Sequence, residues 1–373
     1  MAKAVISSTG LHTPPYAISN QELVDAFNQY VDIQNDRHKA AIEAGEREPL
    51  VYSSCDFIYK ASGIESRYVV DKEGLLDPTR MRPRIRQRSD DEPSLMAEIA
   101  MDAGRQALDA AGRSPEDVDM LLVACSNPQR AYPAVSIELQ HHLGLRGFAF
   151  DMNVACASAA FGIQTAYDAI RSGTARSVLM VNPEICTGHL NYMNRDCHFI
   201  FGDACTAMLI EADDRAPDGG LFEVLGTRTV TQFSNNIRNN FGYLNPAEDP
   251  VRDEFDQLFK QQGRKVFKEV TPLVSQLVVG HIEDLGINVP DIKRLWLHQA
   301  NINMNKLIAK KVYGRDARDA ELPSAIHEYG NTSSASPVIV FHLNSGDLQA
   351  GDVGVLCGFG AGYSAGSVVV RRL

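Results

Sequence analysis

The chain has 373 residues, of which 44% are hydrophobic and 22% charged, values typical of a soluble globular protein with room for two core-forming units. Its net charge of −11 argues against a general nucleic-acid binder, because such proteins neutralise phosphates with a basic surface. The longest apolar runs, such as residues 118–125 and 177–181, have the length of strands and fall far short of the roughly 20 residues that a membrane helix needs. We therefore expect no membrane span.

Residues 1–8 (MAKAVISS) contain one lysine and a very short apolar run, too little for a secretory signal, so we expect a cytoplasmic protein. Seven cysteines are present, and no two of them form a C-x-x-C pair. Neither a disulfide framework nor a zinc site is indicated. We expect reduced thiols, no metal and no bound cofactor.

In chain order, strand-like apolar runs alternate with helix-like segments, which indicates an α/β protein with buried, largely parallel sheets. The polar stretch at about 25–92 interrupts this alternation, and we interpret it as an insertion. It ends in TRMRPRIRQR (79–88), in which every second residue from position 80 is arginine. If extended, the run places five arginines on one face as an anion-attracting strip; alternatively it is a surface loop bonded to the acidic residues around Asp90.

The sequence repeats itself. GRSPEDVDMLLVACSN (112–127) aligns without a gap on GINVPDIKRLWLHQAN (286–301), and each copy follows a helix-like segment that ends at the glycine. A second pair, FGDACTAMLIE (201–211) and FGAGYSAGSVV (359–369), occurs in the same order. We therefore predict two related halves, residues 1–212 with the insertion and residues 221–373.

Cys156 lies in NVACASAAFG (153–162), between a strand-like run at 148–154 and a helix-like run at 158–172. Backbone N–H groups and the dipole at a helix N-terminus can lower a thiol pKa from about 8.5 into the range of about 3.5 to 7.5. Small neighbouring side chains leave room for a substrate. We expect a nucleophilic thiolate here, although a cysteine that only fills space in the core is the simpler interpretation of any single cysteine.

His298 follows the strand-like run 294–297 and precedes a helix that begins near residue 301. In α/β sheets, ligands bind at this edge. Asn331 lies in YGNTSSAS (329–336). Each residue has an ordinary structural interpretation as well, a core histidine bonded to a backbone carbonyl and an asparagine in a turn that starts a helix.

Together with FGAGYSAG near the C-terminus, these motifs resemble the thiolase superfamily and, within it, the β-ketoacyl-[acyl-carrier-protein] synthases of type III. The similarity covers nearly the whole chain and includes SGIESR (62–67), AYPAVSIELQ (131–140), NVACAS, FGDACTAMLI, HQAN and GNTSSAS. It implies a thiolase-like, duplicated, five-layer α/β/α/β/α fold, a homodimer, and a Cys-His-Asn active site formed by Cys156, His298 and Asn331. Asparagine in the third position favours the chain-initiating type.

The resemblance also implies a reaction. Cys156 takes an acyl group from acyl-coenzyme A (acyl-CoA), and malonyl-acyl carrier protein (malonyl-ACP) then decarboxylates to an enolate that attacks the acyl-cysteine. Neutral His298 and the Asn331 amide donate hydrogen bonds to the enolate, and the backbone N–H groups of Cys156 and Ala361 hold the oxyanion. The product is β-ketoacyl-ACP in fatty acid biosynthesis. Ala361 stands where the family usually has glycine.

Substrate contacts are implied at further positions. Lys268, Lys310 and Lys311 match residues that face coenzyme A phosphates or the acidic carrier protein. Arg264 stands where the family often has asparagine near the pantetheine arm. At the adenine-binding segment, Phe57 and Ala61 replace an expected Trp and Arg.

Tyr132 matches an aromatic residue that reaches across the dimer to cap the acyl pocket. The long insertion and the altered coenzyme segment are similar to the longer family members that accept medium-chain acyl-CoA, of the β-ketodecanoyl-ACP synthase kind.

Three other classes of protein stay open. A papain-like thiol hydrolase also uses Cys, His and Asn, but its C-G-[SA]-C-[WY] signature is missing. A superfamily acyltransferase of secondary metabolism would pass the acyl group to an amine or hydroxyl, or condense it with a β-keto acid. A non-catalytic carrier-binding scaffold would not need the three polar residues.

Overall fold

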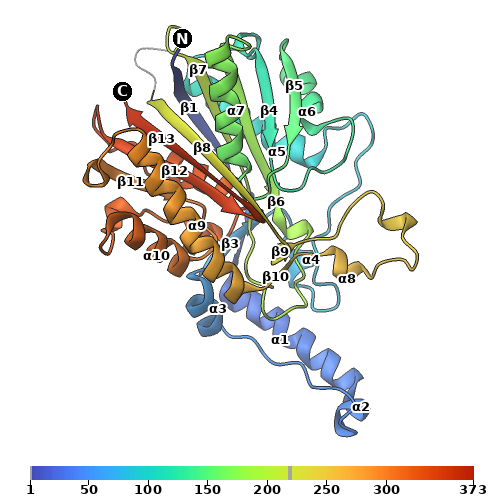
Figure 1. The fold of residues 1–373 in the computed structure, drawn as a ribbon. Coiled ribbons are helices and arrows are strands. Elements are labelled where there is room, and N and C mark those ends of the chain that lie inside the picture. Colours follow the sequence, from blue (N-terminus) through green and yellow to red (C-terminus); the bar gives the residue numbers. More distant parts are fainter. Residues whose placement is uncertain (1, 217–220) are drawn as a thin grey trace.

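The structure, a computed structural model, describes residues 2–216 and 221–373. Within these residues one mixed sheet of nine strands runs through the molecule in the order β11-β12-β13-β8-β1-β7-β6-β4-β5 (Figure 1). The first half of the chain contributes β1 (Ala4–His12), β4 (Met120–Ala124), β5 (Phe148–Met152), β6 (Ser177–Ile185) and β7 (Asp203–Ala212). The second half contributes β8 (Phe222–Ser234), β11 (Ile292–Leu297), β12 (Val353–Gly360) and β13 (Gly362–Arg372).

The two halves of the sheet share one strand order. From the centre outwards, β1-β7-β6-β4 in the first half corresponds to β8-β13-β12-β11 in the second, with β1 and β8 paired where the halves meet. The directions correspond too, since β1–β7, β6–β7, β8–β13 and β12–β13 are antiparallel whereas β4–β6 and β11–β12 are parallel. The segments matched in the sequence repeats therefore occupy equivalent places. The domain boundaries themselves stay a prediction.

The expectation of largely parallel sheets is wrong. Only β4–β5, β4–β6 and β11–β12 are parallel among the pairings of the described part of this sheet. In the second half, the single residue Ala361 joins β12 to β13, and so short a connection requires antiparallel pairing. In the first half, β7 likewise pairs antiparallel with β6.

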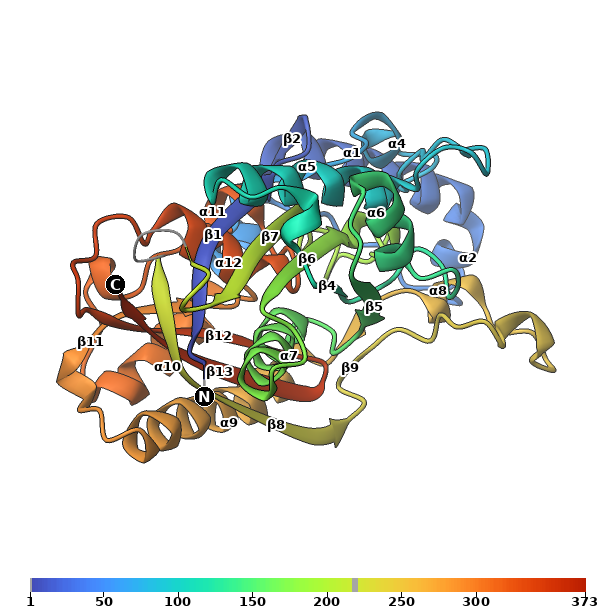
Figure 2. The same cartoon turned by 90° about the horizontal axis from the view of Figure 1, so that it is seen from above.

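Helices complete five layers (Figure 2). The central layer consists of α7 (Ser158–Ser172) and α12 (Ala335–Leu343), which contact strands of both halves and each other. The outer layers are α5 (Leu95–Ala110) with α6 (Val135–Leu143) on the first half, and α9 (Gly263–Asp284) with α10 (Ile302–Tyr313) on the second. The predicted helix ends are confirmed, because Gly112 and Gly286 follow α5 and α9 with φ of 63° and 67°.

The insertion at about 25–92 comprises most of α1 (Asn20–Arg37) with α2 (Lys39–Glu43), α3 (Cys55–Ser62), β3 (Ser66–Val69) and α4 (Glu73–Leu76), and β3 pairs with β2 (Tyr16–Ser19), which precedes it. It is not polar throughout, since Phe27, Val31 and Ile58 are buried in a cluster with Phe199 and Phe201. In Figure 1, α1 and α2 extend away from the sheet. The insertion thus builds a separate core against residues 199–201.

The arginine run does not form an extended strip. Residues 82–88 are irregular, and their guanidinium groups pair within the chain: Arg84 with Asp77 at 2.8 Å, Arg86 with Glu92 at 2.6 Å, and Arg88 with Glu98. The surface-loop interpretation is the correct one. Within the described residues, no helix combines the length and apolar composition required to cross a membrane.

His198 offers a test of how burial couples this fold to pH. Its imidazole is fully buried, stacks on Phe27 at 4.4 Å between ring centroids, and donates from Nδ1 to the Arg195 carbonyl at 2.9 Å. Burial lowers the pKa of His198 to about 3. Unfolding exposes the ring, so the unfolded chain binds a proton at a higher pH than the folded one, and stability is lost as pH falls below about 6.5.

We predict that His198→Phe, which removes this titration, makes the free energy of unfolding less sensitive to acid. For each pH unit below 6.5, the free energy of unfolding of the variant should rise by up to about 1.4 kcal/mol relative to that of the native protein. Denaturant unfolding at pH 7, 6 and 5 measures the difference. Parallel curves for the two proteins would contradict the prediction.

Candidate active site

A cavity of about 520 Å³ brings Cys156, His298 and Asn331 together. Cys156 lies just before α7, His298 follows β11, and Asn331 lies between α11 (Ile326–Tyr329) and α12. The three residues therefore come from the ends of elements in the central layer and the second half of the sheet. Most of the remaining lining is apolar, and it includes Phe199, Phe201, Ile237, Phe259, Phe267 and Phe359.

A strained turn presents Cys156 to the cavity. Ala155 has φ of 48°, a conformation unusual for a residue with a side chain. The turn is held by hydrogen bonds from the Val154 N–H to Ser158 Oγ at 2.8 Å and from the Ala155 N–H to Asn153 Oδ1 at 2.9 Å. The sequence expectation of a strand, a tight turn and a helix is confirmed, with the cysteine partly exposed.

The expected lowering of the Cys156 pKa is wrong. Burial raises the pKa of this thiol to about 12, against the opposing effects of the Ser333 hydroxyl and the backbone N–H groups of Cys156 and Ala361. The sequence reveals the helix that follows Cys156, but it does not reveal how deeply the thiol is buried. Desolvation disfavours the thiolate more than these hydrogen-bond donors favour it. The resting thiol is therefore neutral.

His298 is 1% exposed, and its backbone N–H donates to the Cys357 carbonyl at 2.8 Å. Its ring meets Phe359 edge-on, and Nδ1 lies 2.6 Å from Ser336 Oγ. Burial lowers the pKa of His298 to about 3. The imidazole is thus neutral, with one ring proton.

Asn331 is fixed through both its backbone and its side chain. Its N–H donates to the Ile200 carbonyl at 2.9 Å, and its carbonyl accepts from the Gly202 N–H at 3.1 Å. Its Oδ1 accepts from the Ser333 N–H at 2.8 Å. Because the oxygen is engaged there, the amide Nδ2 remains to donate towards the cavity.

The backbone N–H groups of the predicted oxyanion-hole residues, Cys156 and Ala361, both act on the sulfur, since each opposes the rise of the thiol pKa. Ala361 is not among the described non-glycine residues with positive φ, so alanine fits this position without strain. The neighbouring Gly360 passes very close to the cysteine. A Cβ at residue 360 would lie 2.6 Å from Cys156 Cβ and 3.1 Å from Sγ.

Sequence reasoning missed several supporting residues. Ser333, with φ of 47°, places its hydroxyl 3.3 Å from Cys156 Sγ. Glu184 is 1% exposed and accepts from the backbone N–H groups of Ser126 at 2.9 Å and Ser334 at 3.2 Å. Glu184 thereby ties the start of α12 to the loop after β4. Serines in GNTSSAS were visible in the sequence, but nothing there indicates which group each one contacts.

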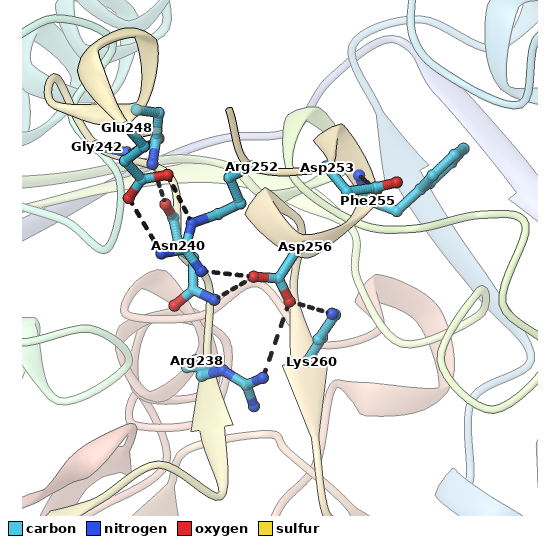
Figure 3. Close-up of polar contacts among 10 residues, drawn as sticks. Arg238, Asn240, Gly242, Glu248, Arg252, Asp253, Phe255, Asp256 and Lys260 are labelled. Atoms are coloured by element: carbon cyan, nitrogen blue, oxygen red, sulfur yellow. Dashed lines mark hydrogen bonds and ion pairs between the residues drawn. The ribbon is translucent and has the colours of Figure 1, made fainter. Parts of the chain in front are cut away.

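One wall of the cavity is a short ribbon, β9 (Ile237–Arg238) paired with β10 (Lys260–Gln261). The loop between these strands contains α8 (Glu254–Gln257). Asp256, on α8, stabilises the loop through polar contacts (Figure 3). The Asp256 carboxylate accepts from Asn240 at 2.8 Å and Arg252 at 2.7 Å, and also pairs with Lys260. These contacts lower the pKa of Asp256, so the fastening persists over the neutral range. It holds Ile237 and Phe259 in place against the cavity.

The predicted coenzyme and carrier residues are spread around the opening. Arg264 is exposed and lines the cavity. Phe57, on α3, is not part of the lining, but its ring lies edge-on to that of Phe199, which is, and the Arg195 guanidinium lies 3.9 Å from its ring centroid. Arg195 was missed because it is 138 positions away in the chain from Phe57, although both lie near Phe199. It supplies a guanidinium that Ala61 cannot.

The lysines and Tyr132 lie outside the cavity lining. Lys268 and Lys311 are exposed and form no ion pair within the described residues, whereas Lys310 pairs with Asp316 at 3.0 Å. Tyr132 is 86% exposed and does not reach the cavity of its own chain. The described residues contain no group of three or more His, Cys, Asp or Glu side chains that could hold a metal ion.

Comparison with known proteins agrees with this geometry. A family model described as 3-oxoacyl-[acyl-carrier-protein] synthase III matches residues 150–228, and the model of that family's C-terminal part matches residues 282–372. The chain is 55% identical to the β-ketodecanoyl-[acyl-carrier-protein] synthase of Pseudomonas aeruginosa over 94% of this chain and 100% of that protein. It is 31% identical to the β-ketoacyl-[acyl-carrier-protein] synthase III of Chelativorans sp. over 83% of this chain and 93% of that protein.

Among solved structures, the 3-oxoacyl-[acyl-carrier-protein] synthase III of Aquifex aeolicus superposes with a TM-score of 0.77 at 22% identity, covering 99% of this chain and 100% of that one. This likeness concerns the fold. The predicted thiolase-like α/β fold is confirmed.

We predict that Gly360→Ala obstructs the sulfur. The added methyl must displace Cys156, and overpacking of this kind costs about 1–3 kcal/mol of stability. If the crowding raises the activation free energy for attack by the sulfur by about 1.4 kcal/mol, alkylation by iodoacetamide slows about tenfold. Intact mass spectrometry measures the rate of alkylation over time. Gly346→Ala, where a Cβ meets nothing within 4 Å, is the matched control and should alkylate at the native rate. Equal rates for the two variants would contradict the prediction.

Proposed function

The chain belongs to the 3-oxoacyl-[acyl-carrier-protein] synthase III family, and from this premise we propose that it condenses a medium-chain acyl-CoA primer with malonyl-ACP. The reaction class is that of the family, an acyl transfer followed by a decarboxylative Claisen condensation in fatty acid biosynthesis. The observation that carries the proposal is the convergence of Cys156, His298 and Asn331 on one buried cavity. The 55% identity to a β-ketodecanoyl-ACP synthase supports the medium-chain primer.

In the first half-reaction, Cys156 sulfur attacks the thioester carbonyl of the acyl-CoA. A new carbon–sulfur bond forms, the carbon–sulfur bond to coenzyme A breaks, and the thiol proton leaves with the coenzyme A thiol. Because the resting thiol is neutral, its proton is lost as attack proceeds rather than beforehand. In this proposal, the backbone N–H groups of Cys156 and Ala361 stabilise the tetrahedral oxyanion, and their favourable effect on a negative charge at the sulfur supports that role.

In the second half-reaction, the malonyl thioester loses carbon dioxide, and the bonding electrons become an enolate. The Asn331 amide and neutral His298 donate to the enolate oxygen, and neither is a strong acid that would quench the carbanion. The carbanion attacks the acyl-cysteine, the β-ketoacyl carrier protein leaves, and one proton from solvent restores the Cys156 thiol.

We propose a homodimer in which Tyr132 of each chain caps the acyl pocket of its partner. The exposure of Tyr132 supports this arrangement. So does β5, an edge strand of the sheet that carries the exposed Phe148 and Phe150, because unpaired edges with exposed aromatic side chains favour association.

Coenzyme A and the carrier protein would meet the opening between α3, α9 and α10. Phe57 and Arg195 offer an aromatic face and a guanidinium for the adenine, and Arg264 lies on the path to Cys156. Lys268, Lys310 and Lys311 supply positive charge for phosphates or for an acidic carrier surface. The family assignment gives no support to the papain-like alternative.

Graded acyl-CoA primers test the reaction. We predict that native protein forms an acyl adduct on Cys156, strongest for medium chains, and that malonyl-ACP then releases it as β-ketoacyl-ACP. Intact mass spectrometry follows both steps. Cys156→Ala should form no adduct yet keep malonyl decarboxylation, because the donors to the enolate remain. Release of free acid by water, or transfer to an amine, would replace the condensing activity with that of a hydrolase or another acyltransferase.

We predict that Arg264→Ala raises KM for acyl-CoA about tenfold while changing kcat little, since a charged contact to a phosphate or amide contributes roughly 1.5 kcal/mol. Arg105→Ala on the outer helix α5 is the control, because Arg105 is exposed and is not among the residues that line the cavity. Steady-state kinetics at saturating malonyl-ACP give both constants. An unchanged KM would remove Arg264 from the coenzyme path.

A further inference from the structure

Ser336 contacts Nδ1 of His298, the ring nitrogen that does not face the cavity. Its Oγ lies 2.6 Å from His298 Nδ1, 3.0 Å from the Gln299 backbone N–H and 2.9 Å from the Ser333 carbonyl. The serine is 1% exposed and is the second residue of α12. These neighbours leave the hydroxyl with a single proton and two competing acceptors, Nδ1 and the Ser333 carbonyl.

The distances indicate where that proton goes. Oγ lies 2.6 Å from Nδ1 and 2.9 Å from the Ser333 carbonyl, so the ring nitrogen is the nearer acceptor. An imidazole lone pair is also a stronger acceptor than a carbonyl oxygen. The hydroxyl proton therefore goes to Nδ1, while the Gln299 N–H occupies one acceptor site of Oγ.

The surrounding chain keeps Ser336 and His298 in this relation. Gln299 is held by its side chain, whose Oε1 accepts from Ser324 Oγ at 2.7 Å and whose Nε2 donates to the Leu297 carbonyl at 2.6 Å. The Asn305 amide donates to the His298 carbonyl at 3.0 Å. Neither the backbone that supplies the Gln299 N–H nor the imidazole is free to move away.

We propose that Ser336 is a positioning residue that fixes His298 in the tautomer with its proton on Nε2, and thereby makes it a hydrogen-bond donor to the enolate. With Nδ1 accepting from Ser336, the single proton of the neutral ring must be on Nε2, the nitrogen turned to the cavity. The catalytic consequence of this inference rests on the proposed function. The position of the ring proton does not depend on that function.

The reverse tautomer carries its proton on Nδ1. The Ser333 backbone favours a proton on the ring, since it raises the pKa of His298 against the effect of burial. Without the Ser336 hydroxyl, Nδ1 has lost its donor and the ring proton can move to that nitrogen. Nε2 then presents a lone pair to the enolate oxygen, and attraction becomes repulsion. Loss of Ser336 should therefore weaken decarboxylation and condensation, while acyl transfer to Cys156 is affected little.

Ser336→Ala tests the proposal in the full-length protein. We expect decarboxylation of malonyl-ACP and release of acyl-cysteine to fall about 100-fold, the lower end of the range of about 100- to 1000-fold for loss of an oxyanion donor. The rate of Cys156 acylation by acyl-CoA should change far less, and its persistence shows that the variant is folded. Ser336→Thr keeps the hydroxyl and should restore much of the loss.

Nitrogen-15 spectra of histidine-labelled protein report the tautomer directly, with His298 assigned from a His298→Gln sample. We expect the Nε2–H form in the native protein and a shift to the Nδ1–H form in Ser336→Ala. Ser367→Ala is the matched control, because Ser367 Oγ lies 3.0 Å from Nδ1 of another buried histidine, His281, outside the cavity. It should leave both the His298 signal and the ratio of the half-reactions unchanged.

An Nδ1–H signal for His298 in the native protein overturns the proposal. So does a Ser336→Ala variant that loses acylation and condensation equally, or that loses neither. If native protein takes no acyl group from any primer, it is the proposed function that fails, and the nitrogen-15 spectra still decide the tautomer.

Discussion

The packing of α7 against α12 between the two halves of the sheet is the contact on which the cavity depends. Cys156 precedes α7 and Asn331 precedes α12, so the packing of the two helices brings their starting loops together. Backbone contacts then set the spacing, with Gly360 against the cysteine and residues 200–202 paired to Asn331. Because these contacts involve main chain or small side chains, little room exists for the site to drift.

Burial decides the chemistry of this site. The same desolvation raises the pKa of the Cys156 thiol and lowers that of His298, so the resting pair is uncharged. A thiolate–imidazolium pair, which thiol hydrolases use, is thereby disfavoured. A neutral cavity with fixed donors suits a reaction that passes through a carbanion, since no strong acid stands beside it.

The opening of the cavity differs from the family pattern that the sequence led us to expect. Ala61 lacks the guanidinium expected at the adenine segment, and Arg195 from a distant loop brings one to the face of Phe57 instead. The ribbon of β9 and β10 is held by charged contacts around Asp256 in addition to the packing of Ile237 and Phe259 on the hydrophobic core (Figure 3). Such polar fastening holds an apolar wall without adding bulk to the cavity.

The sequence by itself determined the elements, their repetition and the identity of the three polar residues, because helix ends, apolar runs and motifs such as NVACAS and GNTSSAS are local patterns. Tertiary structure alone decided what depends on depth and on distant neighbours. The direction of the Cys156 pKa shift, the pairing of the arginine run, the antiparallel returns of β7 and β13, and the contact between Ser336 and His298 belong to this group. Desolvation and hydrogen-bond partners are properties of the packed chain, and no stretch of residues carries them.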